Sequence, residues 1–328
     1  MTSAPDWSGA VSALRHADSV LLIAHVTPDP DALGSALALG MALRSLGKTV
    51  AVSVGEFGFR VPESMNFLPG IELVVSPENV PLSDVVVSCD TASVHRLGVL
   101  ADVLTNAPVS IVIDHHASNA GFGTINVVDP SSPATAEMVL KIIDLLDVDL
   151  DHDIATALYA GLATDTGSFK YRGTTSDTLR TAARLFDTGF DHSTIARLLF
   201  DDEPFSSVQM LGEAMSNAVL RTDVADGLGL VYTFISSQAR GHLDELSMER
   251  VIDNLRRTHE AEVACVFKQS DDGVWKASLR SKSAISVGQI ATSFGGGGHK
   301  FAAGYTGSTD ATEMVERLID ALDSGAGA

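Results

Sequence analysis

The feature that most constrains this chain is a series of short, β-branched apolar runs that stop at ionisable residues. The runs VLLIAHV (20–26), DVVVSCD (84–90) and SIVIDHH (110–116) have this form. Helical patterns separate them, and strands that alternate with helices favour a mostly parallel sheet with helices on both faces. In such a sheet the carboxyl ends of the strands lie at one edge, where ligands bind. The pattern therefore predicts an α/β fold with a ligand site at that edge.

The spacing of apolar residues changes about two thirds of the way along the chain. In the first part we expect a further strand at 49–54 and helices at 32–47, 134–146 and 153–167. In the last part we expect strands at 229–235, 261–269 and 274–281 and helices at 247–258, 286–294 and 310–323. The sequence thus predicts a first domain over 1–192, a helical linker over 193–225, and a smaller α/β domain with a mixed sheet over 226–328.

The overall charge narrows the choice of partners. The chain has 328 residues and a formal net charge of −20, which argues against binding long nucleic acid through a basic surface.

No apolar run approaches the roughly 18 residues of a membrane span, and the N-terminal stretch lacks the basic and apolar regions of a secretory signal. The two cysteines, Cys89 and Cys265, lie far apart, as expected of free thiols in a reducing cytoplasm.

Three more acids accompany the strand ends. Asp29 and Asp31 lie in TPDPDALGS, which follows the first run, and Asp165 lies in LATDTGSF. Taken singly, Asp29 and Asp31 are more readily interpreted as cap and turn residues, and Asp165 as a turn acid. A histidine at one strand end is also usually structural. The joint pattern is harder to explain in this way, and it predicts that these segments converge on one cleft.

The residue types in this predicted cleft favour divalent metals. Carboxylates held close together repel one another unless cations neutralise them. Hard carboxylates combined with imidazoles, and without a thiolate, suit Mn²⁺, with Mg²⁺, Co²⁺ or Zn²⁺ less favoured. Two metals about 3.5–4 Å apart can clamp a phosphoryl group during in-line displacement and activate a water molecule. The pattern therefore predicts phosphoryl chemistry.

A second set of candidates lies near the C-terminal end, in LRSKS and GGGGHKFAAG. The four glycines from Gly295 to Gly298 can adopt positive φ angles and form an anion-binding nest beside His299. A flexible loop is the alternative for the glycines alone. Arg280 carries a fork suited to phosphate, although it could also be an ordinary surface charge.

The motifs in this order resemble those of the DHH phosphoesterase superfamily. HVTPDPDALGS, the aspartate of VVVSCD, the DHH triplet and the aspartate of TDTGSF look like its motifs I to IV, and GGGGHKFAAG is similar to the signature of the DHH-associated C-terminal domain. The two-domain length resembles the nanoRNase branch. RecJ exonucleases are usually longer, and family II pyrophosphatases carry a different C-terminal domain.

This resemblance implies roles for individual residues. His25 and Asp29 would hold one metal, Asp31, His115 and Asp165 a second, and Asp90 would bridge both. His116 would contact the scissile phosphate or protonate the leaving oxygen, and Asp114 would orient a ligand imidazole. The residues implied in substrate binding are Arg280, Ser281, Gly296, Gly297, Gly298 and His299. The expected cofactors are two Mn²⁺ ions, with Mg²⁺ or Co²⁺ as substitutes.

The resemblance also implies an activity. We expect hydrolysis of short oligoribonucleotides and dinucleotides such as pApA, with cyclic dinucleotides such as c-di-AMP and adenosine 3′,5′-bisphosphate as further candidate substrates. A homodimer is implied as well. Two alternatives are a non-catalytic dinucleotide sensor, which the complete set of ligand positions argues against, and an inorganic pyrophosphatase, which the glycine–histidine signature argues against. Arg257, Tyr171 and Arg172 are weaker candidates for lining the site.

Overall fold

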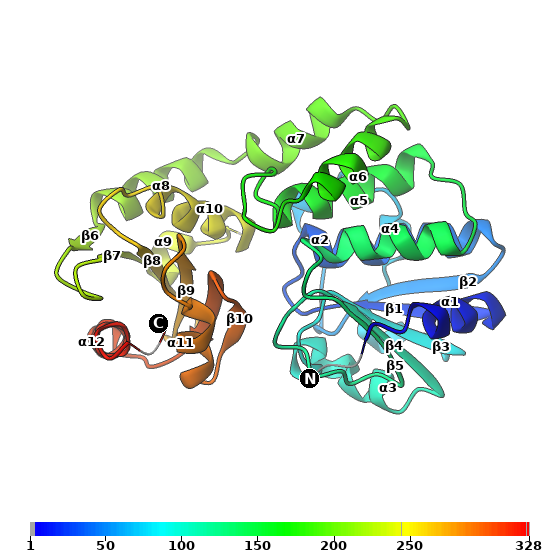
Figure 1. Cartoon of the computed structure of the whole chain (residues 1–328), viewed down its shortest axis with the longest axis horizontal. Coiled ribbons are helices and arrows are strands. Elements are labelled where there is room, and N and C mark those ends of the chain that lie inside the picture. The colour runs from blue at the N-terminus through cyan, green and yellow to red at the C-terminus, as the bar shows by residue number, and fades with distance from the viewer. Residues whose placement is uncertain (1–3, 244, 326, 328) are drawn as a thin grey trace. The chain divides into compact units, whose positions relative to one another are not determined.

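The computed structural model describes residues 4–243, 245–325 and 327 (Figure 1). The chain forms two compact units, the first ending at Asp202 and the second beginning at Glu203. This division falls inside the predicted linker, and the predicted boundaries at 192 and 226 remain a proposal. None of the helices in the described part of the chain is long and apolar enough to cross a membrane.

The first unit contains a five-stranded sheet in the order β2-β1-β3-β4-β5, in which every neighbouring pair is parallel. Its strands are β1 (Ser19–Ala24), β2 (Thr49–Val54), β3 (Val85–Cys89), β4 (Val109–Asp114) and β5 (Ile125–Val128). The four strands predicted for this unit are present. The fifth, β5, has only four residues and was not predicted. The predicted fold class is confirmed.

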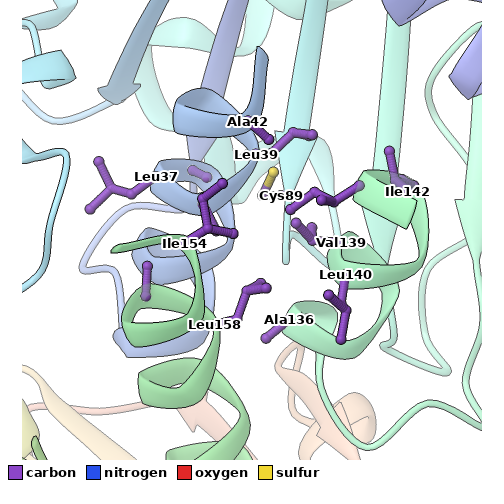
Figure 2. Close-up of a cluster of buried hydrophobic side chains, with 14 of the residues drawn as sticks. Leu37, Leu39, Ala42, Cys89, Ala136, Val139, Leu140, Ile142, Ile154 and Leu158 are labelled. Atoms are coloured by element: carbon purple, nitrogen blue, oxygen red, sulfur yellow. The ribbon is translucent and has the colours of Figure 1, made fainter. Parts of the chain in front are cut away.

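Helices cover both faces of this sheet. The α-helices of the unit are α1 (Trp7–His16), α2 (Pro30–Ser45), α3 (Ala101–Thr105), α4 (Thr135–Leu145), α5 (His152–Asp165), α6 (Ser176–Phe186) and α7 (His192–Phe200). Short 3₁₀ segments are η1 (Glu63–Met65), η2 (Ile71–Leu73), η3 (Pro77–Asn79) and η4 (Val94–Leu100). One face of the sheet packs on α1, α2 and α4, and α5 packs in turn on α2 and α4. Figure 2 shows Leu39, Cys89 and Val139 in that core. The other face packs on η4 and α3.

Small residues allow α2 and α5 to approach closely. A Cβ atom at Gly34 would lie 2.5 Å from the carbonyl oxygen of Ala157, and one at Gly161 would lie 2.6 Å from Oδ1 of Asp31. Both distances are too short for a side chain, so glycine is required at these two positions. The close packing sets the N-terminal end of α2 against α5, and this is where Asp31 lies.

The second unit contains a mixed six-stranded sheet in the order β10-β11-β9-β8-β7-β6, in which only β7 and β8 run parallel. Its strands are β6 (Val219–Arg221), β7 (Leu230–Ile235), β8 (Val263–Gln269), β9 (Trp275–Ser281), β10 (Gly297–His299) and β11 (Ala302–Thr306). Its helices are α8 (Phe205–Ser216), α9 (Ser237–Arg240), α10 (Glu245–Leu255), α11 (Val287–Ser293) and α12 (Ala311–Asp323). Helices α11 and α12 pack on one face and α8 and α10 on the other.

Candidate active site

The carboxyl ends of the three central strands of the first unit carry ionisable residues side by side. Ala24 of β1 is level with Cys89 of β3, so His25 and Asp90 leave the sheet together, and Asp114 ends β4 next to them. Asp90 has a φ of 55°, a left-handed conformation that a non-glycine residue adopts only under constraint. Such constraint is typical of functional positions.

The first turn of α2 contributes two acids to the same place. Asp29 caps the helix by accepting a hydrogen bond from the backbone N–H of Ala32 at its Oδ1 atom (2.9 Å). Its Oδ2 atom lies 3.6 Å from Nε2 of His25, and Oδ2 of Asp90 lies 3.7 Å from the same nitrogen. Asp29 is therefore both the N-cap that the simpler interpretation required and a member of the cluster.

His115 joins the cluster from the other side of Asp90. Its Nε2 atom lies 3.4 Å from Oδ1 of Asp90 and 3.1 Å from Oδ2 of Asp165, the last residue of α5. Its Nδ1 atom lies 3.2 Å from the backbone carbonyl oxygen of Ser132. A negative charge at a helix C-terminus is unfavourable. A nearby cation would therefore stabilise the ionised carboxylate of Asp165.

The structure corrects the partner predicted for Asp114. We expected this carboxylate to orient a metal-binding imidazole, but its Oδ1 atom lies 2.7 Å from Nδ1 of His116, the predicted phosphate contact. Asn119 donates from Nδ2 to the Oδ2 atom of Asp114 (2.6 Å) and to the carbonyl oxygen of Thr91 (3.0 Å). The chain Asn119–Asp114–His116 thus fixes the imidazole of His116, while a backbone carbonyl orients His115.

The N-terminus of α4 holds two of the predicted metal ligands, a role that the sequence did not reveal. The backbone N–H groups of Thr135 and Ala136 donate to the two oxygens of Asp31 (2.7 and 2.9 Å). Ala134, the N-cap residue of α4, offers no side-chain hydrogen bond, so Asp31 caps this helix from 104 residues away. The hydroxyl of Thr135 donates to Oδ1 of Asp90 (2.9 Å).

Burial and mutual repulsion perturb the acids of the cluster. Burial, followed by the charge of Asp90, holds the pKa of Asp31 well above its usual range, and burial also raises the pKa of Asp165. Burial acts against ionisation of Asp90 as well, but its hydrogen bond to His115 and the neighbouring imidazoles outweigh burial and lower its pKa. Several carboxylates with opposed pKa shifts in one small volume mark a functional site.

The histidines of the cluster respond in the opposite sense. Burial disfavours their charged forms, but the hydrogen bonds that His115 donates to Asp165 and Asp90 outweigh it and raise the pKa of His115 well above its usual value. The pKa of His116 is also raised, because its hydrogen bond to Asp114 and the charge of Asp90 exceed the effect of burial. When protonated, these imidazoles partly neutralise the carboxylates of the cluster. Bound cations could neutralise the same carboxylates in their place.

The donor atoms fit two divalent cations. One group consists of His25, Asp29 and Asp90 and a second of Asp31, Asp90 and His115, and within each group the ligand atoms lie within 4.8 Å of one another. Asp90 is common to both, as expected of a bridging carboxylate. Carboxylate oxygens and imidazole nitrogens without thiolates match hard or borderline metals. All six predicted metal ligands, including Asp165 beside His115, therefore lie together, although their individual roles remain a proposal.

In the second unit, strand register places Arg280 and His299 on one face of the sheet. Arg280 is paired with Ala302 and Ala302 with His299, so the three form a row across β9, β11 and β10. The next row on the same face consists of Ser278, Gly304 and Gly297. Glycine and alanine leave the area between Arg280 and His299 without bulky side chains, which suits the approach of a flat ligand.

Ser281 lies apart from this row. It follows Arg280 in β9, so its side chain is on the opposite face of the sheet, and its hydroxyl donates to Oε1 of Glu262 (2.7 Å). The same oxygen accepts the backbone N–H groups of Ser283 and Ala284 (2.6 Å each). The structure therefore does not bring Ser281 together with Arg280, contrary to the prediction, and gives it a role in shaping the turn after β9.

Arg280 is held by a partner that the sequence did not reveal. Glu249 of α10 accepts from Nη2 of Arg280 (2.7 Å), from Nζ of Lys268 (3.1 Å) and from the hydroxyl of Ser278 (3.3 Å). Burial would raise the pKa of Glu249, but the two cations outweigh it and lower the pKa to about 2. One carboxylate thus orients two cations.

The predicted nest of four glycine amides is only partly formed. The backbone N–H of Gly295 donates to the carbonyl of Thr292 (3.0 Å), and that of Gly296 donates to Ala291 (2.8 Å). These bonds close the C-terminus of α11 and occupy two of the amides. Gly297 and Gly298 continue into β10, and Gly298 has a φ of 135°. Successive N–H groups of a strand point to opposite sides, and β10 pairs with β11 on one of them, so Gly297 and Gly298 do not offer two neighbouring free amides to an anion.

A parallel sheet whose central strands end in a carboxylate–histidine cluster, together with a second unit whose sheet places Arg280 and His299 in one row, is typical of two-domain metal-dependent phosphoesterases. Residues 19–162 match the DHH family, N-terminal domain, and residues 228–326 match the DHHA1 domain. The chain belongs to the DHH phosphoesterase family, and its members depend on metal ions.

Individual relatives support this assignment. The chain is 35% identical to the bifunctional oligoribonuclease and PAP phosphatase NrnA of Thermus thermophilus over 92% of this chain and 89% of that protein. It is 26% identical to the cyclic-di-AMP phosphodiesterase PdeA of Listeria monocytogenes over 95% of this chain but only 48% of that protein. The fold matches an exopolyphosphatase-related protein from Bacteroides fragilis with a TM-score of 0.85, at 24% identity, over 98% of this chain and 96% of that one.

Proposed function

We propose that this protein hydrolyses phosphodiester bonds in short oligoribonucleotides and linear dinucleotides and releases 5′-mononucleotides, with two Mn²⁺ ions as cofactors. The observation that carries the proposal is the carboxylate of Asp90, which is shared by three groups of potential metal ligands, two of which consist of predicted ligands alone. Such sharing is what a two-metal phosphoesterase requires. Similarity to an oligoribonuclease over most of both chains supports the substrate class.

The proposed mechanism assigns different tasks to the two histidines of the DHH triplet. His25, Asp29, Asp31, His115 and Asp165 would hold the cations, and Asp90 would bridge them. Bound cations would supply positive charge to the phosphoryl oxygens and make water acidic enough to react near neutral pH.

His116 would act on the substrate itself. Asp114 orients its ring and favours the protonated form, as the raised pKa indicates. A protonated imidazole in this position can donate a proton to the leaving oxygen of the ribose as the phosphorus–oxygen bond breaks. Asn119, which is buried and fixes Asp114, would keep this donor in place.

The second unit would hold the far end of the substrate. Arg280 offers a guanidinium fork for a phosphate, and His299 lies in the same row of the sheet. Gly297 and Gly298 would allow a nucleotide to approach the backbone, whereas Gly296 would contribute through its lack of a side chain, since its amide is already bonded. Ser281 would act only indirectly, through the turn that Glu262 organises.

A site built in this way selects for short substrates. It provides cations and a few positively charged side chains at defined points, whereas a net charge of −20 gives no surface for a long polyanion. We include pApA, cyclic dinucleotides such as c-di-AMP, and adenosine 3′,5′-bisphosphate among the candidate substrates. Similarity to a cyclic-di-AMP phosphodiesterase and to a PAP phosphatase supports the last two. We also propose a cytoplasmic homodimer.

A substrate panel tests this proposal. The purified chain would be incubated with Mn²⁺ and, separately, with pApA, a longer RNA, c-di-AMP, adenosine 3′,5′-bisphosphate and pyrophosphate, and the products would be separated by chromatography. We expect Mn²⁺-dependent release of AMP from pApA at a higher rate than from the longer RNA. The Asp90→Ala variant serves as the inactive control.

The outcomes separate the competing functions. Rapid hydrolysis of pyrophosphate alone would identify a pyrophosphatase. Tight binding of a dinucleotide without metal and without turnover would identify a sensor. If none of the substrates is hydrolysed and Asp90→Ala behaves like the wild type, the proposed function is wrong.

A further inference from the structure

Arg96 lies directly beside one of the proposed metal ligands. It belongs to η4, which follows Asp90, and its Nη2 atom is 2.9 Å from Nδ1 of His25. The backbone around it is anchored, because the N–H of Val26 donates to the carbonyl oxygen of Arg96 (2.8 Å) and that of Val99 donates to Gly55 (3.0 Å). The side chain itself is exposed. A fixed backbone thus carries a guanidinium that can move.

The contact between Arg96 and His25 is not compatible with metal binding by His25. The Nε2 atom of His25 faces Asp29 and Asp90, so this nitrogen would give its lone pair to a cation. A neutral imidazole then carries its hydrogen on Nδ1, where the carbonyl oxygen of Val26 lies 2.9 Å away and can accept it. Because arginine has donors only, its N–H would then face another N–H group.

Loading the site would therefore release the guanidinium of Arg96 while its backbone stays in place. Within the described part of the chain, no carboxylate lies within ion-pair distance of Arg96, whereas many other arginines, such as Arg15, Arg44 and Arg184, are paired with acids. A guanidinium without a carboxylate partner, close to a proposed metal pair in an acidic protein, is well suited to an anionic ligand. The anion that the proposed function brings there is a phosphate.

We propose that Arg96 is a phosphate-binding residue of the first unit, which exchanges its contact with His25 for an oxygen of the substrate phosphate when the metal site is loaded. This assignment rests on the proposed function and adds a residue outside the DHH motifs. The guanidinium would bind a phosphoryl oxygen beside the cation held by His25.

Calorimetric titrations of the full-length protein test this assignment without relying on turnover. Mn²⁺ is titrated first, and 5′-AMP is then titrated into the Mn²⁺-loaded protein as a product-type phosphate ligand. For Arg96→Gln we expect AMP binding to weaken by about 10- to 100-fold, as for the loss of a charge-assisted hydrogen bond. Mn²⁺ affinity should be unchanged or tighter, because a competing donor has been removed. Arg96→Lys should give an intermediate loss of AMP binding.

A matched control and two contrary outcomes make the test decisive. Arg44→Gln removes an exposed arginine from the last turn of α2, paired with Glu72, and should leave both titrations unchanged. If Arg96→Gln weakens Mn²⁺ binding as much as AMP binding, Arg96 merely supports His25. If neither changes, Arg96 has no role. Absence of dinucleotide hydrolysis by the wild type would overturn the proposed function, whereas the assignment of Arg96 is decided by AMP binding.

Discussion

The two units of this protein bury charge in opposite ways. In the first unit, Asp31, Asp90 and Asp114 are at most 2% exposed, and their nearest cationic partners are histidines, which are charged only when protonated. In the second unit, the carboxylate of Glu249 is balanced by Lys268 and Arg280. A buried carboxylate cluster without permanent cations is stabilised by added metal. A carboxylate that already has two permanent cationic partners needs no added metal. The comparison predicts that metal stabilises the first unit and leaves the stability of the second unchanged.

The sharpest way to test the division of labour in the first unit is to separate its two adjacent histidines. His115→Ala should lose metal, because its Nε2 faces Asp90 and Asp165. His116→Ala should keep the metal but slow turnover by about 10²- to 10⁴-fold, as for removal of a general acid. Metal content by atomic emission and turnover of pApA are the measurements. Equal loss of metal in both variants would contradict the separation of roles.

Metal should stabilise the first unit alone. Mn²⁺ at about 1,000 times its dissociation constant should raise the free energy of unfolding of this unit by about 4 kcal/mol. The chain has two tryptophans, Trp7 in the first unit and Trp275 in the second. Fluorescence of Trp275→Phe therefore follows the first unit during urea unfolding, and that of Trp7→Phe follows the second.

The control for this experiment is Asp90→Asn, which removes the shared carboxylate charge. It should abolish the response of the Trp7 signal to Mn²⁺ and leave the Trp275 signal as it was. If Mn²⁺ stabilises both units equally in the single-tryptophan variants that keep Asp90, metal does not act on the first unit alone. The comparison between the units would then fail.

Thr135 tests whether the N-terminus of α4 organises the metal ligands. Thr135→Val removes the hydroxyl that donates to Asp90 and keeps the shape of the side chain. We expect Mn²⁺ affinity to fall by about 10- to 100-fold, as is usual when a hydrogen bond to a metal ligand is lost. Thr135→Ser, which keeps the hydroxyl, should restore most of it. The measurement is calorimetric titration with Mn²⁺.

Thr156→Val provides the matched control, because Thr156 is buried in α5 and its hydroxyl donates to the carbonyl oxygen of His152 instead of a proposed ligand. Its Mn²⁺ affinity should equal that of the wild type. A similar loss in both threonine variants would attribute the effect to general destabilisation and not to the bond with Asp90.

The smallest expected effect concerns Glu249 in the second unit. Its pKa is lowered from 4.5 to about 2 in the folded protein, so its stabilising contribution is present above about pH 4.5 and lost as the pH falls towards 2. Glu249→Gln should therefore lower the free energy of unfolding by about 1–2 kcal/mol at pH 7. The difference from the wild type should shrink below pH 4. Urea unfolding followed by Trp275 fluorescence measures both effects.

Glu213→Gln is the control for this substitution, since Glu213 is an exposed residue of α8 in the same unit. It should leave stability unchanged between pH 3 and 7. If Glu249→Gln is as stable as the wild type at pH 7, the carboxylate does not stabilise the cationic pair in the way that the geometry indicates.

The sequence by itself determined the alternation of strands and helices, the strand ends that carry His25, Asp90 and His115, and the residue types from which metal chemistry follows. These features are local, because hydrophobic periodicity and short motifs are read within a single segment. The short strands β5, β10 and β11 were not predicted for the same reason. Each has five residues or fewer, too few for a periodic signal.

Only the tertiary structure decided which side chains and backbone groups form hydrogen bonds with those residues. Thr135 reaches Asp31 across 104 residues and Arg96 reaches His25 across 71, while Glu249 reaches Arg280 across 31. Strand register also separated Ser281 from Arg280, although they are adjacent in the chain. Hydrogen bonds between distant segments depend on packing geometry, which leaves no local pattern in the sequence. The sequence therefore pointed to the proposed metal ligands, and the fold revealed the residues that hold those side chains in place.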